Sequence, residues 1–188
     1  MVATGRDSAL LESALRYADL GWAVLPLYSI GDDGHCNCLK GERCPSPGKH
    51  PRTDHGVHDA TTDHESIVAW WTACPEANVG IATGSTSGIV VIDVDPRHQG
   101  DRSLTSLVER YDAFGPTPEV RTGGRGTHIF LAYPDAPVKN SSGQVAAGID
   151  VRGDGGYVVA PPSNHYSGGV YAWEEDKEPS HTEPAPVP

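Results

Sequence analysis

Apolar residues near the N-terminus recur at the spacing of a helix. Leu11, Leu15 and Ala18 fall on one stripe of residues 7–20, so this segment predicts an amphipathic helix. Gly21 follows and is well suited to end the helix, because glycine adopts left-handed backbone angles without strain.

Further elements follow from the clustering of apolar residues. Thr62 and Glu65 have the spacing of a capping box, which predicts that a helix containing Trp70 and Trp71 begins there. The run at 89–92 is apolar on both faces, which is typical of a central strand covered on both sides. A third helix is expected at 103–111, and strands are expected at 22–28, 79–83, 88–95, 127–133, 148–152, 157–160 and 170–173. This mixture predicts an α/β (α+β) sheet domain.

The length of 188 residues fits one ordinary domain. The Pro-rich end, residues 177–188, has few apolar side chains, so we expect a linker or tail there after a domain spanning 1–176. No stretch approaches the roughly 20 apolar residues that span a bilayer. The N-terminus has no basic region followed by an apolar run, as a secretory signal would have. We therefore expect a cytoplasmic protein with no membrane contact.

The net charge of −11 is unevenly distributed. Residues 35–58 carry two more basic than acidic residues, whereas 174–188 carry four more acidic than basic ones. The acidic tail therefore inflates the negative total. Even so, the composition gives no strong footprint for DNA, so we do not expect tight DNA binding by this domain alone.

The segment 31–56 is polar, rich in Gly, Pro and Cys, and too poor in apolar residues to bury a core by itself. Three thiols and one imidazole lie within fifteen residues, at Cys36, Cys38, Cys44 and His50. This set predicts a structural Zn²⁺ site in an insertion at about 35–58, with His35 or His55 as alternatives to His50.

Two carboxylates mark the end of the apolar strand. Asp93 and Asp95 are two residues apart, so their side chains are expected on the same face. Paired carboxylates are tolerated mainly beside a cation, and oxygen ligands suit Mg²⁺ or Mn²⁺. The alternative is that these residues cap a turn. Asp150 ends another strand-like run and is the candidate third ligand, with Asp154 in a Gly-rich turn as its rival.

The glycine-rich bend at 122–128 runs into a predicted strand. Glycines let backbone amides approach phosphate, and Arg125 and His128 could supply charge to a triphosphate. The alternative is a plain hairpin turn. The bend is not a Walker loop, since no Gly-Lys-Ser/Thr follows it.

These features occur in an order that resembles the bifunctional primase–polymerase family of plasmids, phages and prophages, within the archaeo-eukaryotic primase superfamily. The resemblance runs from about Leu10 to Trp173. It is carried by the segments 21–26, 47–51, 60–63, 70–71, 78–84, 88–95, 124–128, 148–152 and 156–163.

The resemblance implies a two-layer α/β catalytic core around a recognition-motif-like sheet, often with an inserted zinc stem. It places the family's catalytic metal-binding acids on Asp93, Asp95 and Asp150, and its phosphate-contacting histidine on His128. Arg125, Arg152 and Ser163 are further candidate nucleotide contacts. Family members often carry a helicase domain after this one, to which the Pro-rich end would be a linker.

The resulting hypothesis is a template-dependent DNA primase/polymerase that makes and extends primers by two-metal catalysis. Its partners would be single-stranded DNA template and primer, with NTPs or dNTPs as substrates. Basic residues of the zinc segment, Lys49 and Arg52, are candidate contacts for the template or initiating nucleotide. A catalytically silent zinc-containing DNA-binding module that recruits a replicative helicase is one alternative, and a metal-dependent phosphohydrolase is another.

Overall fold

The computed structural model describes residues 5–111 and 114–187. Within them the chain is a mixed α/β protein with three α-helices and two antiparallel sheets, which confirms the predicted fold class. The chain forms two compact units, one containing the residues up to Ala82 together with Tyr157–Tyr171, and the other containing Thr83–Gly156 and the residues from Ala172 onward. From the sequence we expect one catalytic domain over 1–176, and the structure divides these residues between the two units.

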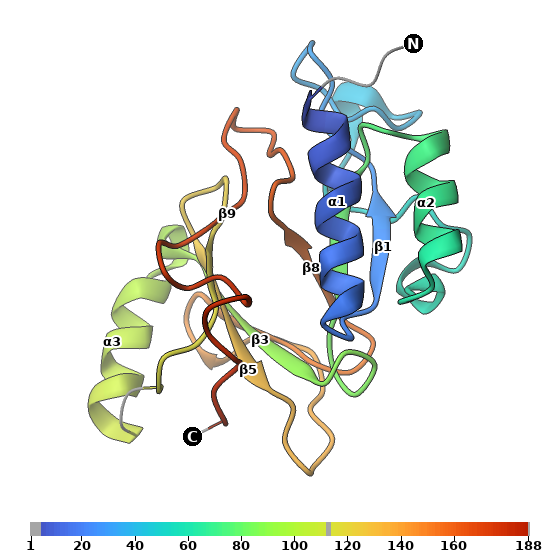
Figure 1. Cartoon of the computed structure of the whole chain (residues 1–188). Helices are drawn as coiled ribbons and strands as arrows, with labels where there is room; N and C mark the ends of the chain where they lie inside the picture. Colours follow the sequence, from blue (N-terminus) through green and yellow to red (C-terminus); the bar gives the residue numbers. More distant parts are fainter. Residues whose placement is uncertain (1–4, 112–113, 188) are drawn as a thin grey trace. The chain divides into compact units, whose positions relative to one another are not determined.

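The first unit is built on a three-stranded antiparallel sheet in the order β1-β2-β8. Its strands are β1 (Val24–Leu27), β2 (Asn78–Ala82) and β8 (Tyr157–Ala160), and every residue of β1 and β2 is buried. Helices α1 (Gly5–Asp19) and α2 (His64–Ala73) lie beside β1 (Figure 1). The two helices also contact each other, and α1 contacts β2.

Helix α1 buries the predicted Ala18, but the rest of its buried stripe lies one residue away from the predicted positions. Leu10, Ala14 and Tyr17 are buried, whereas Leu11 and Leu15 are only half-buried. This rotation lets the Tyr17 ring stack on Trp22 and its hydroxyl donate to the carbonyl of Pro161 at 2.8 Å. The helix ends as predicted before Gly21, which has a φ of +80°.

The cap of α2 differs from the capping box expected at Thr62. The N-cap is Asp63, whose carboxylate accepts a hydrogen bond from the backbone N of Ser66 at 2.8 Å. An ionised carboxylate at this position also interacts favourably with the helix dipole, so Asp63 is the stronger cap of the two.

The polar segment between β1 and α2 folds back onto the first strand. It contains two short 3₁₀ helices, η1 (Gly41–Arg43) and η2 (Gly56–Asp59). The backbone N of Tyr28 donates to the carbonyl of His50, and that of Arg52 donates to Pro26, each at 2.9 Å. Residues 50–52, at the far side of the cysteines, are therefore anchored to the end of β1.

The second unit contains a six-stranded antiparallel sheet in the order β6-β7-β3-β5-β4-β9. The central position of β3 confirms the prediction made from its apolar run. The strands are β3 (Ile89–Val94), β4 (Glu119–Arg121), β5 (Thr127–Ala132), β6 (Ser141–Ala146), β7 (Ile149–Arg152) and β9 (Ala172–Trp173).

One face of this sheet is apolar and packs on helix α3 (Gly100–Tyr111). Val94 is buried there, Ile92 packs beside it, and Leu104 and Leu107 of α3 pack against the same cluster. Because side chains alternate along a strand, Asp93 points to the opposite face. The packing of Ile92 and Val94 on α3 thus fixes the face to which Asp93 points.

The Pro-rich end is anchored to the six-stranded sheet at Ala185, although most of its described residues are exposed. Ala185 is buried, pairs with Leu131 in a parallel bridge, and its carbonyl accepts from the backbone N of Ala132 at 2.8 Å. A single small apolar residue thus fills a gap in the sheet's core, which the composition of 177–188 does not reveal. Pro188 lies outside the described residues, and a helicase domain beyond it stays a prediction.

Among the described residues, no helix combines the length and the apolar character needed to cross a membrane.

Candidate active site and metal centre

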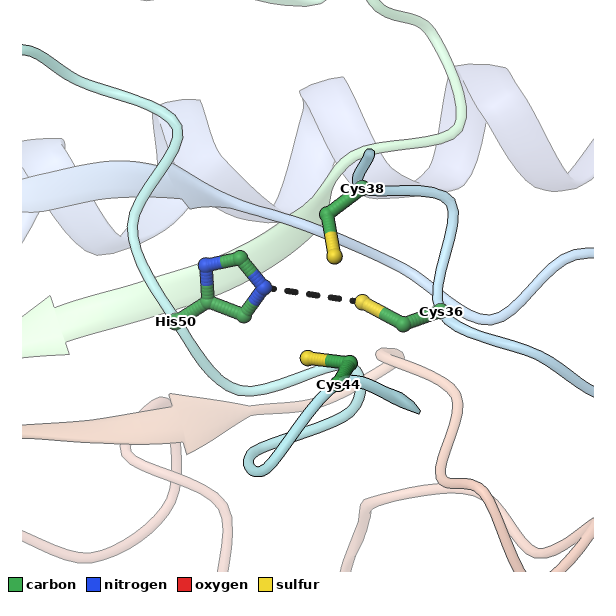
Figure 2. Close-up of side chains that lie close together, drawn as sticks. All are labelled: Cys36, Cys38, Cys44 and His50. Atoms are coloured by element: carbon green, nitrogen blue, oxygen red, sulfur yellow. Dashed lines mark hydrogen bonds between the residues drawn. The ribbon is translucent and has the colours of Figure 1, made fainter. Parts of the chain in front are cut away.

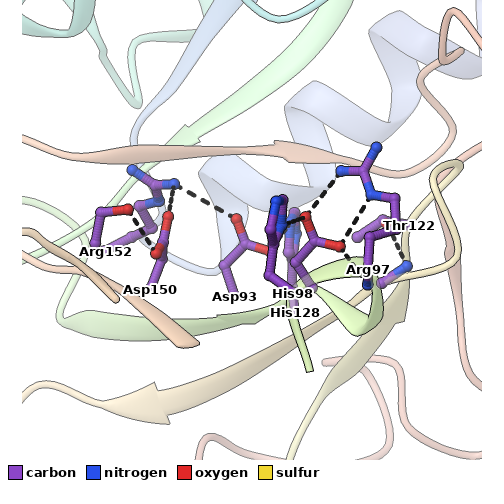
Figure 3. Close-up of polar contacts among 10 residues, drawn as sticks. Asp93, Arg97, His98, Thr122, His128, Asp150 and Arg152 are labelled. Carbon is purple, nitrogen blue, oxygen red and sulfur yellow. Dashed lines mark hydrogen bonds and ion pairs between the residues drawn. The ribbon is translucent and has the colours of Figure 1, made fainter. Parts of the chain in front are cut away.

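Three predicted site residues form one row across the six-stranded sheet. Asp93 of β3 lies directly opposite Asp150 of β7 on one side and His128 of β5 on the other. Residues opposite each other on neighbouring strands have Cβ atoms about 5 Å apart and point to the same face. The register therefore gathers two carboxylates and an imidazole that are far apart in the sequence (Figure 3).

Arg152 supplies the positive charge in this row. Its Nη2 atom lies 2.8 Å from Oδ2 of Asp150 and 3.5 Å from Oδ2 of Asp93. On the other side of Asp93, Nε2 of His128 lies 3.7 Å from Oδ1. The carboxylates are about a quarter to a third exposed, whereas the His128 side chain is only 7% exposed. The row is thus open to solvent at the aspartates and closed at the histidine.

Asp150 is also fixed from the edge strand β6. Its Oδ1 atom accepts hydrogen bonds from the Ser142 hydroxyl at 2.8 Å and from the backbone N of Gly143 at 3.0 Å. Sequence reasoning missed this contribution, because the β6 sequence is polar and gives no strand pattern.

Asp95 has polar partners of its own, Arg97 and His98. It lies one residue beyond β3 and caps the 3₁₀ helix η3 (Pro96–His98). Its carboxylate accepts hydrogen bonds from the backbone N, Nε and Nη2 of Arg97 at 2.9–3.0 Å, and Nδ1 of His98 lies 2.9 Å away. The Arg97 guanidinium holds the pKa of Asp95 well below its usual range. The turn-cap alternative thus describes Asp95 in this structure.

The position of Asp95 is set by closely packed glycines. A Cβ on Gly100 would lie 2.4 Å from the carbonyl oxygen of Gly148, and one on Gly126 would lie 2.6 Å from that of Val94. Backbone bonds join Asp95 to both Gly148 and Gly100, each at 2.9 Å. The three segments that contain Gly100, Gly126 and Gly148 can therefore meet at the end of β3 only because glycine has no side chain.

The glycine-rich bend is a hairpin turn between β4 and β5. The backbone N of Thr122 donates to Gly126 at 2.8 Å, and the Thr122 hydroxyl accepts from the backbone N of Gly126 at 2.9 Å. Arg125 is exposed at the tip with a φ of +69°. The hairpin alternative thus describes the backbone, which also places His128 at the second residue of β5.

Two other candidates have structural partners. Ser163 is fully buried, and its hydroxyl accepts from the backbone N of Val79 at 2.8 Å, so the predicted nucleotide contact does not fit this structure. Asp154, the rival to Asp150, accepts from the Tyr133 hydroxyl at 2.7 Å and from the backbone N of Ser85 at 3.0 Å. Its carboxylate therefore stabilises a loop, which favours Asp150 as the site residue.

The four predicted zinc ligands converge in the first unit. The Sγ atoms of Cys36, Cys38 and Cys44 and a ring nitrogen of His50 all lie within 4.8 Å of one another (Figure 2). With Zn–S bonds of about 2.3 Å, the sulfurs of a tetrahedral site are about 3.8 Å apart. The spacing and the soft donor set therefore fit a Cys₃His site that could hold a metal such as zinc. Within residues 5–111 and 114–187, no other group of three or more candidate ligands is this close.

The surroundings of the cluster suit a closed structural site. Cys36 and Cys44 are buried, and burial raises the pKa of the Cys44 thiol to about 11. Burial, together with the charges of Lys40 and Arg52, lowers the pKa of His50, which favours the neutral imidazole that binds metals. The alternative ligands His35 and His55 are exposed, and His55 is paired with Asp59 at 2.9 Å.

A comparison with protein-family models matches residues 14–188 to the family described as bifunctional DNA primase/polymerase, N-terminal. The chain belongs to this family. The match covers nearly the whole sequence and confirms the resemblance carried by its motifs. A search of curated proteins found no match.

The carboxylate row of this primase/polymerase domain fits the divalent metals on which such enzymes depend. Asp93 and Asp150 offer hard oxygen donors on one face of the sheet. A cation, the Arg152 guanidinium, already lies against both. The row thus provides both the ligand chemistry and the local demand for positive charge.

The residues that sequence reasoning missed in the primase/polymerase domain are those that hold the aspartates. Ser142 fixes Asp150, and Arg97 and His98 fix Asp95. A signal for the last two exists in the sequence, since a proline after Asp95 starts a tight turn that returns the next side chains to the carboxylate.

Proposed function

We propose that the domain is a template-directed nucleotidyltransferase that makes and extends primers. The observation that supports this most is the row of Asp150, Asp93 and His128 across three neighbouring strands, in a chain of the primase/polymerase family. Two carboxylates beside an imidazole donor suit a reaction in which a nucleotide's phosphates are held while negative charge moves onto the leaving pyrophosphate.

Asp93 and Asp150 would hold Mg²⁺ or Mn²⁺, and Asp95 would join them if Arg97 releases its carboxylate. When bound, the divalent ions supply Lewis acidity that activates the primer hydroxyl and stabilises the leaving group. His128 lies against Asp93, and its largely buried ring would contact a phosphate oxygen held beside the carboxylates.

Arg152 would exchange partners during the reaction. The carboxylates of Asp93 and Asp150, which now contact its guanidinium, are the ones that would hold a divalent ion, so Arg152 would be displaced from them. A guanidinium displaced from them binds phosphate oxygens well, because its paired N–H groups match their geometry. Arg152 thus changes from a carboxylate partner into a contact for the incoming triphosphate.

The test is primer extension on a primed template with Mn²⁺ or Mg²⁺ and each nucleotide type. Asp93→Asn and Asp150→Asn remove ligand charge without changing side-chain size, and we expect each to slow extension at least about a hundredfold. Asp135→Asn, at an exposed position outside the row, is the matched control and keeps wild-type activity. Extension that survives both row substitutions overturns the site assignment.

The same assay separates the rival functions. Phosphate release without extension indicates a phosphohydrolase that uses the same carboxylates. DNA binding with neither reaction indicates a catalytically silent module. Because ribonucleotides and deoxyribonucleotides are tested in separate reactions, the assay also reports which of them the domain prefers.

A further inference from the structure

A pocket of about 490 Å³ lies beside the zinc ligands in the first unit. Its walls include Pro47 and Lys49 from the cysteine segment, and Tyr157 and Tyr166 from β8 and the loop that follows it. The pocket therefore combines two aromatic rings with one ammonium group. Neither the carboxylate row nor the metal cluster gives these residues a role.

The charge of this pocket differs from that of the whole chain. The protein has a net charge of −11, yet no carboxylate is among the residues that line this pocket. Among the described residues, no carboxylate forms an ion pair with Lys49 either. A second pocket of about 590 Å³, which also has aromatic walls, is lined by both Asp54 and Asp59. Because Arg52 and His55 in that second pocket lie beside two carboxylates, the pocket next to the zinc ligands is the better suited of the two to an anion.

The loop after β8 presents Tyr166 in a fixed position. Tyr166 is 46% exposed, but the neighbouring His165 is buried and its ring lies 4.3 Å from that of Tyr166. His165 also packs edge-on against Tyr171, and the backbone N of His165 donates to Gly169 at 2.9 Å. An exposed ring on an ordered loop loses little entropy when a planar group stacks on it.

The opposite wall is held by the metal cluster. Cys44 and His50 lie on either side of the segment that carries Pro47 and Lys49. The Tyr157 hydroxyl donates to the carbonyl of Lys49 at 3.0 Å, which joins this segment to β8. A metal bound to Cys44 and His50 would therefore fix the width of the pocket.

We propose that this pocket binds one unpaired nucleotide of the single-stranded DNA template, with the base stacked on Tyr166 and a backbone phosphate against Lys49. Stacking on an aromatic ring with a nearby cation is how proteins hold single strands without reading their sequence. The inference rests on the proposed function, because a template strand is a ligand for an enzyme that copies one. A free nucleoside triphosphate fits less well, since its several negative charges need more donors than one ammonium.

The test is fluorescence anisotropy of the metal-loaded domain with a labelled oligodeoxythymidylate about 12 nucleotides long. We expect Tyr166→Ala to weaken binding roughly fivefold or more, while Tyr166→Phe, which keeps the ring, retains the wild-type affinity. Lys49→Ala should reduce the slope of log affinity against log salt by about 0.7, the value for one phosphate contact on a single strand, and Lys49→Arg should restore it.

Matched controls remove the same residue types elsewhere. Tyr111→Ala and Lys139→Ala change exposed side chains of the second unit, and neither should alter the affinity or the salt slope. The proposal is overturned if both Tyr166→Ala and Lys49→Ala bind the oligonucleotide with the wild-type affinity and the wild-type salt slope. It is also overturned if free dTTP binds in a Tyr166-dependent way while the oligonucleotide does not.

Two further measurements separate this site from the proposed catalytic site. Asp93→Asn should slow extension at least about a hundredfold yet keep the Tyr166-dependent binding, so a failed extension assay does not imply a failed pocket. Conversely, the wild type could extend primers while Tyr166→Ala leaves the KM for the template unchanged. That result rejects the pocket and leaves the proposed catalytic site standing. Removing the metal with a chelator should weaken oligonucleotide binding to about the level of Tyr166→Ala, because the wall that carries Lys49 is then no longer fixed.

Discussion

Asp93 and Asp150 lie directly opposite each other on neighbouring antiparallel strands, and the guanidinium of Arg152 contacts both. Like charges placed opposite each other destabilise a sheet unless a cation lies between them. The domain thus uses a basic side chain where the proposed reaction needs a divalent ion. This relationship makes the site testable by stability as well as by activity.

Arg152→Ala should expose the repulsion between the two carboxylates. In the presence of a chelator, we expect the free energy of unfolding to fall by about 1 kcal/mol, which corresponds to a decrease in Tm of about 2–4 °C. Mn²⁺ should then raise the Tm of the variant more than that of the wild type, because the ion no longer competes with the guanidinium. Arg121→Ala, which removes a 3.9 Å surface ion pair with Glu174, is the control. Equal Mn²⁺ shifts in all three proteins would contradict a metal site at this pair.

Asp95→Asn should destabilise the domain in a pH-dependent way. The Arg97 guanidinium depresses the pKa of Asp95 in the folded protein, so this carboxylate stabilises the fold above its unfolded pKa of about 3.9. That contribution is lost as the pH falls through and below this value. We expect the variant to be about 1–2 kcal/mol less stable at neutral pH, and the difference to shrink below about pH 4.

Urea unfolding of both proteins over this pH range measures the difference, with Asp135→Asn as the exposed control. A difference that stays constant down to acid pH would indicate that the charge of Asp95 contributes nothing. The charge interaction with Arg97 and His98 would then not explain the stability of η3.

The strongly patterned parts of the fold could be predicted from the sequence. The apolar run of β3 identified a central strand, and Gly21 identified the end of α1. Strand β4 could not be predicted because it has only three residues, and β6 could not be predicted because it is a mostly exposed edge strand that needs no apolar alternation. The buried stripe of α1 differs by one residue because tertiary contacts of Tyr17 choose among adjacent apolar positions.

For the site, residue types and strand ends pointed to Asp93, Asp150 and His128, but only the strand order brings them together. Register depends on pairing between segments that are far apart in the chain, which a linear pattern does not encode. The pairing of Asp95 with Arg97 is different, because it forms within a local turn that returns Arg97 to the carboxylate. The zinc ligands were predictable as a set, since four donors close in sequence need no knowledge of the remaining fold.

Substitution of a cysteine in the cluster should remove a bound metal and lower stability. We expect about one zinc per domain by elemental analysis, lost in Cys44→Ser and retained in Cys74→Ser, since Cys74 lies outside the cluster and accepts a hydrogen bond from Arg52.

Burial raises the pKa of Cys44 to about 11, so metal binding must release its proton at neutral pH. The apparent zinc affinity should therefore fall as the pH is lowered from about 8 to 6. An affinity that does not change with pH would contradict binding through this thiol.

Gly148→Ala should disturb the end of β3 more than its backbone angle alone explains. Gly148 has a φ of +69°, and a Cβ there would lie 2.6 Å from the backbone N of Gly100. Gly155 has a nearly identical φ of +70° with nothing within 4 Å, so Gly155→Ala isolates the cost of the angle. We expect about 1 kcal/mol of destabilisation for the control and about 2–4 kcal/mol for Gly148→Ala, measured by urea unfolding.

Because the carbonyl of Gly148 accepts from the backbone N of Asp95, Gly148→Ala should also lower primer extension in the protein that remains folded. Equal effects of the two substitutions would show that the three chain segments can move apart without cost.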